Sequence, residues 1–271
     1  MDTRKTRNFF LVAILLPMIV FCQEDSTKKN VFAASVNYQT KLHYFGRVDS
    51  LQSSGLFPTL SVELKNGLYA TGNFIFIQNS AQSTTYTGTT IEAGYRFPDA
   101  KHFTGNIFYT QFLYKDKSEL VQSALKSQAG FNAAYTNKFV NINAGADLKF
   151  SDKVDIGATA GFDHLFIVKL GNKKALAFNP SAYLYAGTQQ FSNTYRKNTS
   201  GLLGLPSTGQ TVTEEVTAFN VLAYEFSSPI VFVAGKFNAS VTPSYVIPQQ
   251  LIQGENGKQL FYVSMGIGVR L

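Results

Sequence analysis

The sequence predicts a closed antiparallel transmembrane β-barrel of about twelve strands, with short turns at one end and longer loops at the other. Three observations support this prediction: an N-terminal segment typical of exported proteins, an apolar/polar alternation of period two through the rest of the chain, and connections whose lengths alternate. The barrel must close because lipid cannot hydrogen-bond the backbone of an open strand edge.

The N-terminal segment has the order of a secretory signal peptide. Arg4, Lys5 and Arg7 precede an apolar run from Phe9 to Phe21, after which the chain turns polar. A helix needs roughly 20 apolar residues to cross a bilayer, so this run is too short for a retained anchor. We therefore expect residues 1–22 to be removed on export.

Cleavage before Gln23 leaves a short periplasmic tail, residues 23–30, followed by the barrel, residues 31–271. The competing interpretation is a lipoprotein that carries its lipid on Cys22. Phe21 disfavours it, because a small residue normally precedes a lipidated cysteine.

Alternation begins directly after the tail. Between Val31 and Phe45, apolar residues such as Phe32 and Val36 alternate with polar ones such as Ser35 and Asn37. A helix of period 3.6 cannot produce this pattern over such a length, so a strand is predicted. Counting further segments of this kind gives predicted strands near 31–45, 57–65, 68–78, 88–97, 103–115, 125–136, 139–150, 154–169, 174–188, 215–228, 230–246 and 258–271.

The connections between these segments alternate in length along the chain, a short one followed by a longer one. If both termini lie at the inner end, the inner turns are Lys65-Asn66-Gly67, Pro98 to His102, Asn137-Lys138, Leu170 to Lys173 and Ser228-Pro229. The outer connections are 46–56, 79–87, 116–124, 151–153, 189–214 and 247–257, and all but 151–153 exceed every inner turn. Short periplasmic turns and longer extracellular loops are typical of bacterial membrane barrels.

Strand length favours a membrane barrel over a soluble one. The predicted strands average about 12 residues, longer than the usual 5 or 6 of globular sheets. Strands of about 9 to 11 residues cross a bilayer, whereas a soluble sandwich or lipocalin-like barrel, the alternative, would turn its apolar face inward. Aromatic residues at predicted strand ends are candidates for interfacial girdles: Tyr44, Phe45, Tyr95, Phe97, Tyr114, Tyr135 and Phe139.

The last twelve residues, Leu260 to Leu271, resemble the closing strand of Gram-negative outer-membrane β-barrel proteins. The resemblance implies location in the outer membrane and recognition by the barrel-assembly machinery. The residues that match the polar, glycine, apolar and terminal-apolar spacing of that signal are Ser264, Gly266, Val269 and Leu271, although the terminal residue is more usually Phe. Other segments look like motifs of one barrel group, with no activity attached: Tyr44-Phe45-Gly46-Arg47, residues 186–189 and residues 242–248.

Composition narrows the function classes. Charged residues make up 15% of the chain, against about 25% in ordinary soluble domains. The net charge of +7 is modest and contains no basic run, so no nucleic-acid partner is expected. A single cysteine excludes an intramolecular disulfide framework and a multi-cysteine metal site. Without a P-loop, a dinucleotide-binding glycine pattern or a His-rich metal spacing, we predict no cofactor and no metal.

Charged residues on the polar faces would line the lumen. They are of both signs, so they either set the selectivity of a narrow pathway or pair across the lumen and plug it. The selectivity candidates are Lys41, His43, Glu92, Arg96, Asp147, Glu225, Lys236 and Arg270, and Glu63, Lys149, Asp155 and Asp163 share the same faces.

The longest predicted loop, residues 189–214, exceeds the roughly 15 residues beyond which loops are usually functional or disordered. Its apolar residues Leu202, Leu203 and Leu205 favour burial. The loop could fold inward as a constriction, or outward as a docking surface for another envelope protein.

An enzyme would need a positioned base, and the histidines are His43, His102 and His164. His164 falls on the predicted lipid face, while its neighbour Asp163 points the other way, so the two cannot form a local dyad. A proteolytic pair of His43 with Asp155 at the outer mouth stays open. We predict no enzymatic activity.

The function predicted from these observations is a passive pore for small hydrophilic solutes in the outer membrane. The alternative is a plugged structural or accessory barrel that binds another envelope component, and a more distant one is an outer-membrane hydrolase. The expected partners are outer-membrane lipid and, during biogenesis, the assembly machinery.

Overall fold

The computed structural model describes residues 29–48, 51–115, 125–188, 218–249 and 259–271. The predicted signal peptide, most of the tail and the 189–214 loop lie outside these ranges. The described residues form β-strands and their connections, with no helix long and apolar enough to span a membrane.

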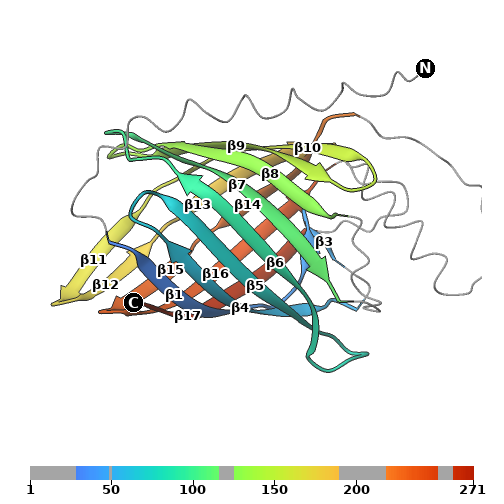
Figure 1. The fold of residues 1–271 in the computed structure, drawn as a ribbon, viewed down its shortest axis with the longest axis horizontal. Helices are drawn as coiled ribbons and strands as arrows, with labels where there is room; N and C mark the ends of the chain where they lie inside the picture. Colours follow the sequence, from blue (N-terminus) through green and yellow to red (C-terminus); the bar gives the residue numbers. More distant parts are fainter. Residues whose placement is uncertain (1–28, 49–50, 116–124, 189–217, 250–258) are drawn as a thin grey trace, which may run out of the picture.

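Twelve antiparallel strands close into one barrel, as predicted. The first strand, β1, pairs with β4 on one side and with the last strand, β17, on the other, which closes the ring (Figure 1). The continuous strands of the ring are β1 (Val31–Gln39), β4 (Ser54–Glu63), β5 (Leu68–Gln78), β6 (Thr85–Arg96), β7 (Phe103–Tyr114), β8 (Ser127–Tyr135), β9 (Asn141–Phe150), β16 (Phe237–Pro248) and β17 (Leu260–Arg270).

Three strands of the ring are interrupted and continue past the break. They consist of β10 (Val154–Asp163) with β11 (Phe166–Gly171), β12 (Lys174–Phe178) with β13 (Ser181–Gly187), and β14 (Asn220–Ser227) with β15 (Ile230–Ala234). Strand β16 pairs with β14 over one half of its length and with β15 over the other. Strands β11, β12 and β15 therefore form an extension of the wall. Strand β11 lies at the edge of this extension, next to β12.

The predicted turn at Ser228-Pro229 is wrong. Pro229 has no N–H to give to the ladder, so it interrupts the strand, but the chain keeps its direction and continues as β15. The chain reverses instead at Gly235-Lys236, between the paired residues Ala234 and Phe237. Gly235 has φ +62°, and glycine at the first central position is typical of two-residue hairpin turns.

The first predicted strand, 31–45, is also too long. Strand β1 ends at Gln39, and the following residues leave the wall and form a separate hairpin of β2 (His43–Tyr44) and β3 (Arg47–Val48). The alternation continues into this segment because a hairpin has the same period-two pattern as a wall strand. Periodicity alone cannot tell which strand will be the partner.

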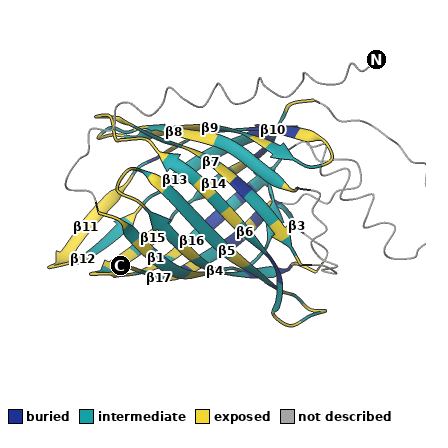
Figure 2. Ribbon diagram, viewed as in Figure 1, coloured by how far each residue is buried: buried dark blue, intermediate teal, exposed yellow. Residues whose placement is uncertain are grey.

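Apolar residues cover the outside of the ring. Large apolar side chains on one face of each strand stay exposed, whereas residues of the opposite face are mainly polar or small. Exposed and intermediate positions are interspersed along the strands of the ring (Figure 2). Exposed outward residues include Phe32, Leu60, Ile91, Ile107, Phe131, Ile142, Ile156, Phe162 and Ile267. This is the reverse of a soluble barrel, in which the apolar side chains would fill the interior.

The predicted aromatic girdle holds in part. Phe97, Tyr135 and Phe139 are exposed at strand ends, and Phe139 is 74% exposed. Tyr114, in contrast, is on the inward face, because it directly follows the outward Leu113 on the same strand. Its hydroxyl donates to the Leu125 carbonyl at 2.9 Å. Tyr44 and Phe45 belong to the hairpin and are therefore no part of a girdle.

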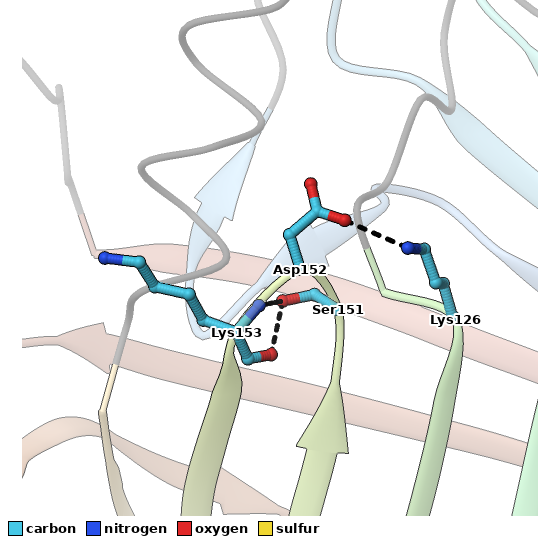
Figure 3. Close-up of polar contacts among 4 residues, drawn as sticks. All are labelled: Lys126, Ser151, Asp152 and Lys153. Atoms are coloured by element: carbon cyan, nitrogen blue, oxygen red, sulfur yellow. Dashed lines mark hydrogen bonds and ion pairs between the residues drawn. The ribbon is translucent and has the colours of Figure 1, made fainter. Parts of the chain in front are cut away.

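We call the two ends of the barrel the turn end and the loop end. The turn end holds β1's first residue, the C-terminus and the connections 64–67, 97–102, 136–140, 172–173 and 235–236. The loop end includes the short 151–153 turn, where Ser151 Oγ accepts a hydrogen bond from Lys153 N at 3.1 Å (Figure 3). Lys126, just before β8, pairs with Asp152 of this turn at 2.9 Å, but both side chains are mostly exposed, so the pair adds little stability.

Candidate functional site: the lumen and the hairpin at its mouth

The lumen wall near the turn end is rich in amides and hydroxyls. A cavity of about 460 Å³ is lined there by Asn106, Asn132 and Asn143, with Thr104, Thr159 and Tyr183 beside them. Asn132 Nδ2 donates to Asn106 Oδ1 at 3.4 Å, across the pair β7–β8. Neutral donors and acceptors of this kind suit water and uncharged polar groups.

Glu92 is the centre of a hydrogen-bond network on β5, β6 and β7. Its Oε1 accepts from the Tyr69 hydroxyl at 3.1 Å, and its Oε2 accepts from Thr110 Oγ1 at 3.0 Å. Asn106 Nδ2 donates to the Tyr69 hydroxyl at 2.9 Å. A carboxylate held by hydrogen bonds on both oxygens is fixed against the wall.

Arg96 lies on the same wall, nearer the turn end. Its guanidinium is 3.6 Å from Glu63 Oε2 and 6.0 Å from the centre of the Tyr69 ring. The Arg96 side chain is 57% exposed and borders the 460 Å³ cavity. Arg96 therefore keeps its charge available to whatever occupies the lumen.

Near the loop end, charges pair along the wall rather than across it. Asp147 and Lys149, two residues apart on β9, form an ion pair with side chains only 15% and 11% exposed. They lie over Gly157, where an added Cβ would come within 2.5 Å of Asp147 Oδ2 and of Lys149 Nζ. Asp155 is fully buried and accepts a hydrogen bond from Thr188 Oγ1.

The β2–β3 hairpin folds into the loop end of the lumen. Its two central residues, Phe45 and Gly46, have φ of +49° and +83°, as a tight hairpin turn of type I′ requires. Gly46 is enclosed, because a Cβ there would lie 3.0 Å from Val246 Cγ1 and 3.1 Å from Pro248 Cδ on β16. Arg47 Nη2 donates to the Gln249 carbonyl at 3.2 Å.

Apolar packing holds this hairpin in place. Phe45 and Val48 pack on a buried cluster of Ala223, Val246, Leu260 and Tyr262, and the Phe45 ring centre is 5.3 Å from that of Tyr185. A left-handed backbone costs a residue such as Phe about 1–2 kcal/mol. Full burial of a large apolar side chain contributes about 1.5–3 kcal/mol, and the partly buried Phe45 and Val48 together contribute a comparable amount. Packing in the mouth can therefore offset the strain of the turn.

Beneath the hairpin lies a second cavity, of about 250 Å³. It is lined by aromatic residues from the hairpin and the wall, by Ala223 and Val246, and by Glu225. The Tyr262 hydroxyl donates to Glu225 Oε1 at 2.7 Å, and the His43 ring lies 4.4 Å from the Tyr262 ring, centre to centre. We call this space the hairpin cavity; its aromatic members are His43, Tyr44, Phe45 and Tyr185.

Burial changes the acid–base behaviour of the hairpin. It lowers the pKa of His43 from 6.5 to about 4, so the ring is neutral at pH 7. Gly46 N donates to His43 Nδ1 at 3.2 Å, which requires that nitrogen to carry no proton. For Tyr44, burial first, and then the negative charge of Asp155, raises the pKa of the hydroxyl.

The predicted lumen residues separate into distinct places. Glu92, Arg96, Asp147, Glu225 and Arg270 lie on inward-facing positions of the wall. His43 is in the hairpin and Lys41 in the chain leading to it, where the carbonyl of Lys41 accepts from Gln39 Nε2 at 2.7 Å. Lys236 lies in the turn before β16, and its carbonyl accepts from the backbone N–H of Arg270 at 2.8 Å.

Sequence reasoning missed the aromatic part of the site. Tyr185 and Tyr262 are inward neighbours of Ala223 and Glu225 in three dimensions, but neither carries a charge that would have singled it out. Phe45-Gly46 was available as a signal, because a residue followed by glycine between two short alternating segments is a hairpin pattern. The asparagines of the larger cavity were missed for the same reason as the tyrosines.

The residues considered as catalytic candidates have the following contacts. Asp155 bonds Thr188, and its charge acts on Tyr44. His164 contacts the Phe166 ring at 4.4 Å, and its backbone N–H donates to the Pro180 carbonyl. Within the described ranges no group of three or more His, Cys, Asp or Glu side chains could hold a metal ion.

The C-terminal strand places its signal residues on both faces. Ser264 and Gly266 pair with inward residues of β1, and Val269 pairs with the outward Ala34. Leu271, after the strand, is 66% exposed.

Comparison with known proteins supports the architecture. A scan against family models and a search of curated proteins each found no match. Among solved structures the chain is similar to a KdgM porin (TM-score 0.51, 9% identity, covering 88% of this chain and 98% of that one). It is also similar to a NanC porin (TM-score 0.48, 9% identity, 89% and 100%) and to LpxR from Salmonella typhimurium (TM-score 0.44, 10% identity, 88% and 99%). The chain therefore has the fold of an outer-membrane porin barrel, a closed antiparallel ring of twelve strands.

Proposed function

We propose that this protein is an outer-membrane pore for small hydrophilic solutes, with its turn end in the periplasm and its loop end outside the cell. The observation that carries the proposal is the polar cavity of about 460 Å³ inside a ring whose outer face is apolar. An apolar outer face suits lipid, and a polar interior with open volume suits water and solute.

The charges on the wall support a pathway rather than a sealed interior. The ion pairs Glu63–Arg96 and Asp147–Lys149 each join residues on the same side of the ring. Charges paired along one wall leave the space in front of them open, whereas charges paired across the lumen would fill it. The hairpin at the loop end then forms the narrowest part of the pathway.

Single-channel recording in a planar bilayer tests this proposal. The refolded mature chain is compared with an Arg96→Gln variant, which removes a cation from the large cavity. We expect stepwise openings in both, with a reversal potential in a salt gradient that moves toward cation selectivity in the variant. Selectivity should move because the lumen loses a positive charge that faces solute.

The matched control is Lys173→Gln, which removes the same charge from the tip of the β11–β12 hairpin, away from the large cavity. Its selectivity should equal that of the unaltered protein. A folded barrel that inserts but never opens would refute the pore, and equal shifts in the two variants would show that Arg96 does not line the pathway.

A second candidate function is an occluded barrel that binds another envelope component. The packed hairpin favours it, and so does the extension, where Phe166, Ile167, Val168 and Leu170 of β11 are each at least 50% exposed. In this alternative the 189–214 segment is a further candidate for partner contact. A folded barrel that inserts into the bilayer but conducts no ions would favour this function over the pore.

Biogenesis belongs to the same proposal. Export would remove residues 1–22, and the assembly machinery would recognise Ser264, Gly266, Val269 and Leu271 in the closing strand. The support is the position of this strand, which completes the ring by pairing with both β1 and β16.

A further inference from the structure

We propose that the hairpin cavity binds a small organic cation of the alkylammonium class, held by Glu225 and by the aromatic rings around it. The site lies inside the lumen, so it would give the pore a preferred ligand. Binding itself does not require conduction, and the two can be tested separately.

The charge of the cavity favours a cation. Among its described lining residues, Glu225 and His43 are the ones able to carry a charge near neutral pH, and His43 is neutral there because its Nδ1 accepts a hydrogen bond and its ring is buried. Within the described residues no lysine or arginine forms an ion pair with Glu225. The carboxylate accepts from the neutral Tyr262 hydroxyl, and none of the described residues that line the cavity is a lysine or an arginine.

Aromatic rings enclose the same space. Phe45 and Tyr44 come from the hairpin, with ring centres 4.5 Å apart, and Tyr185 approaches from β13. The faces of such rings attract cations, and the attraction grows when water is excluded. Aromatic side chains around a carboxylate are a general arrangement for alkylammonium groups, because the methyl groups contact the rings while the charge faces the carboxylate.

The size of the cavity limits the ligand. At about 250 Å³ it is smaller than the 300–1,000 Å³ typical of sites for drug-sized molecules. A choline-sized cation is therefore a better match than a larger one. A sugar would stack on the rings equally well, but it would leave the charge of Glu225 without a counter-charge.

Isothermal titration calorimetry tests this inference on the refolded full-length barrel. Dodecyl maltoside micelles are suitable because their sugar head group carries no ammonium to compete. Choline is titrated as the probe, and 3,3-dimethylbutan-1-ol, its uncharged counterpart of similar shape, is titrated beside it. We expect choline to bind saturably and the uncharged molecule to bind at least about tenfold more weakly.

Variants separate the two parts of the site. Glu225→Gln keeps the shape of the side chain and should weaken choline binding at least about tenfold, whereas Phe45→Leu, which removes one ring, should weaken it about threefold. Asp152→Asn is the control, because it removes a carboxylate from the exposed 151–153 turn, outside the cavity, and it should leave binding unchanged. Circular dichroism of each variant verifies that the barrel has folded.

Equal binding of choline and its uncharged counterpart would overturn the inference, because the cavity would then recognise only shape. Absence of saturable choline binding would overturn it as well, and so would full binding by a folded Glu225→Gln variant. A barrel that binds choline but conducts no ions would retain this inference and lose the proposed pore.

Discussion

At the scale of single residues, glycines on the inward face make room for aromatic side chains from the next strand. A Cβ on Gly94 would lie 2.6 Å from the Tyr69 hydroxyl, and one on Gly161 would overlap the Tyr183 ring. Each tyrosine can therefore lie flat along the wall rather than project across the lumen. Open volume in the barrel depends on these glycines as much as on the polar side chains that line it.

His43 makes the hairpin sensitive to acid. Its ring contacts the Tyr262 ring at a tilted angle and accepts from the Gly46 N–H, and it shares the hairpin cavity with Tyr44 and Glu225. Because the pKa of His43 is lowered by burial, its packing stabilises the hairpin fully above pH 6.5, and this contribution is lost as the pH falls through about 4. Protonation would place a proton on Nδ1 and break the bond from Gly46.

We expect the ¹³C signal of the His43 ring in labelled, refolded protein to titrate with a midpoint near pH 4. A His43→Gln variant identifies the signal by its disappearance. A midpoint near the ordinary 6.5 would mean that the ring is solvated and the hairpin does not pack into the mouth.

At the scale of elements, the hairpin and the ring are separate pairing units. Strands β2 and β3 pair with each other, and within the described residues no barrel strand pairs with either of them. The hairpin is held by side-chain packing and by the bond from Arg47 to Gln249. The ring should therefore form without it.

Replacing residues 43–48 with two glycines should leave a folded barrel with a larger single-channel conductance. The expected loss in unfolding free energy is about 2–5 kcal/mol, the contribution of burying Phe45 and its neighbours. Conductance in planar bilayers and urea unfolding in lipid vesicles measure the two effects. An unchanged conductance would show that the hairpin does not constrict the pathway.

The break at Pro229 shows why a proline in the sequence does not by itself identify a chain reversal. Proline is common in turns, but here it interrupts β14 and β15 without reversing the chain, since Asn179 donates to the Pro229 carbonyl at 3.0 Å and Ser228 to that of Pro243 at 3.1 Å. The Pro229 carbonyl and the Ser228 N–H are thus both hydrogen-bonded to neighbouring segments of the sheet. Gly235, with its positive φ, marks the actual turn.

At the scale of the whole molecule, the outer surface implies lipid as its surroundings. Large apolar side chains are exposed around the ring, while fully buried residues are few and lie mostly near the loop end (Figure 2). A chain of this kind has no conventional core. Its stability in a bilayer comes from the closed hydrogen-bond ladder and from contact of the outer face with hydrocarbon.

Adjacent residues at the middle of β8 test which face meets lipid. Phe131 points outward and is 50% exposed, whereas Asn132 lines the large cavity. Phe131→Arg should lower the unfolding free energy in lipid vesicles by about 2–4 kcal/mol, the cost of arginine at the bilayer midplane. Asn132→Arg should change it by less than about 1 kcal/mol, because the new charge meets water. Equal effects of the two substitutions would contradict a membrane-spanning β8.

By itself the sequence determined the class of fold, the number of strands and the apolar outer face. These follow from local alternation and from turn residues such as Asn66-Gly67, which act within a few positions of the chain. It also placed Glu92, Arg96, Asp147 and Glu225 on the inward face, because the side-chain period of a strand is two.

Only the tertiary structure decided where the chain leaves the wall and which side chains meet inside it. Tyr38 and Tyr44 alternate in the same pattern, but one pairs with β17 and the other with Arg47 across a hairpin. Glu225, Tyr185 and His43 are far apart in sequence and come together because ring closure brings β13, β14 and the hairpin to one side of the mouth. Pairing partners and cavities depend on contacts between distant segments, and period-two alternation carries no information about them.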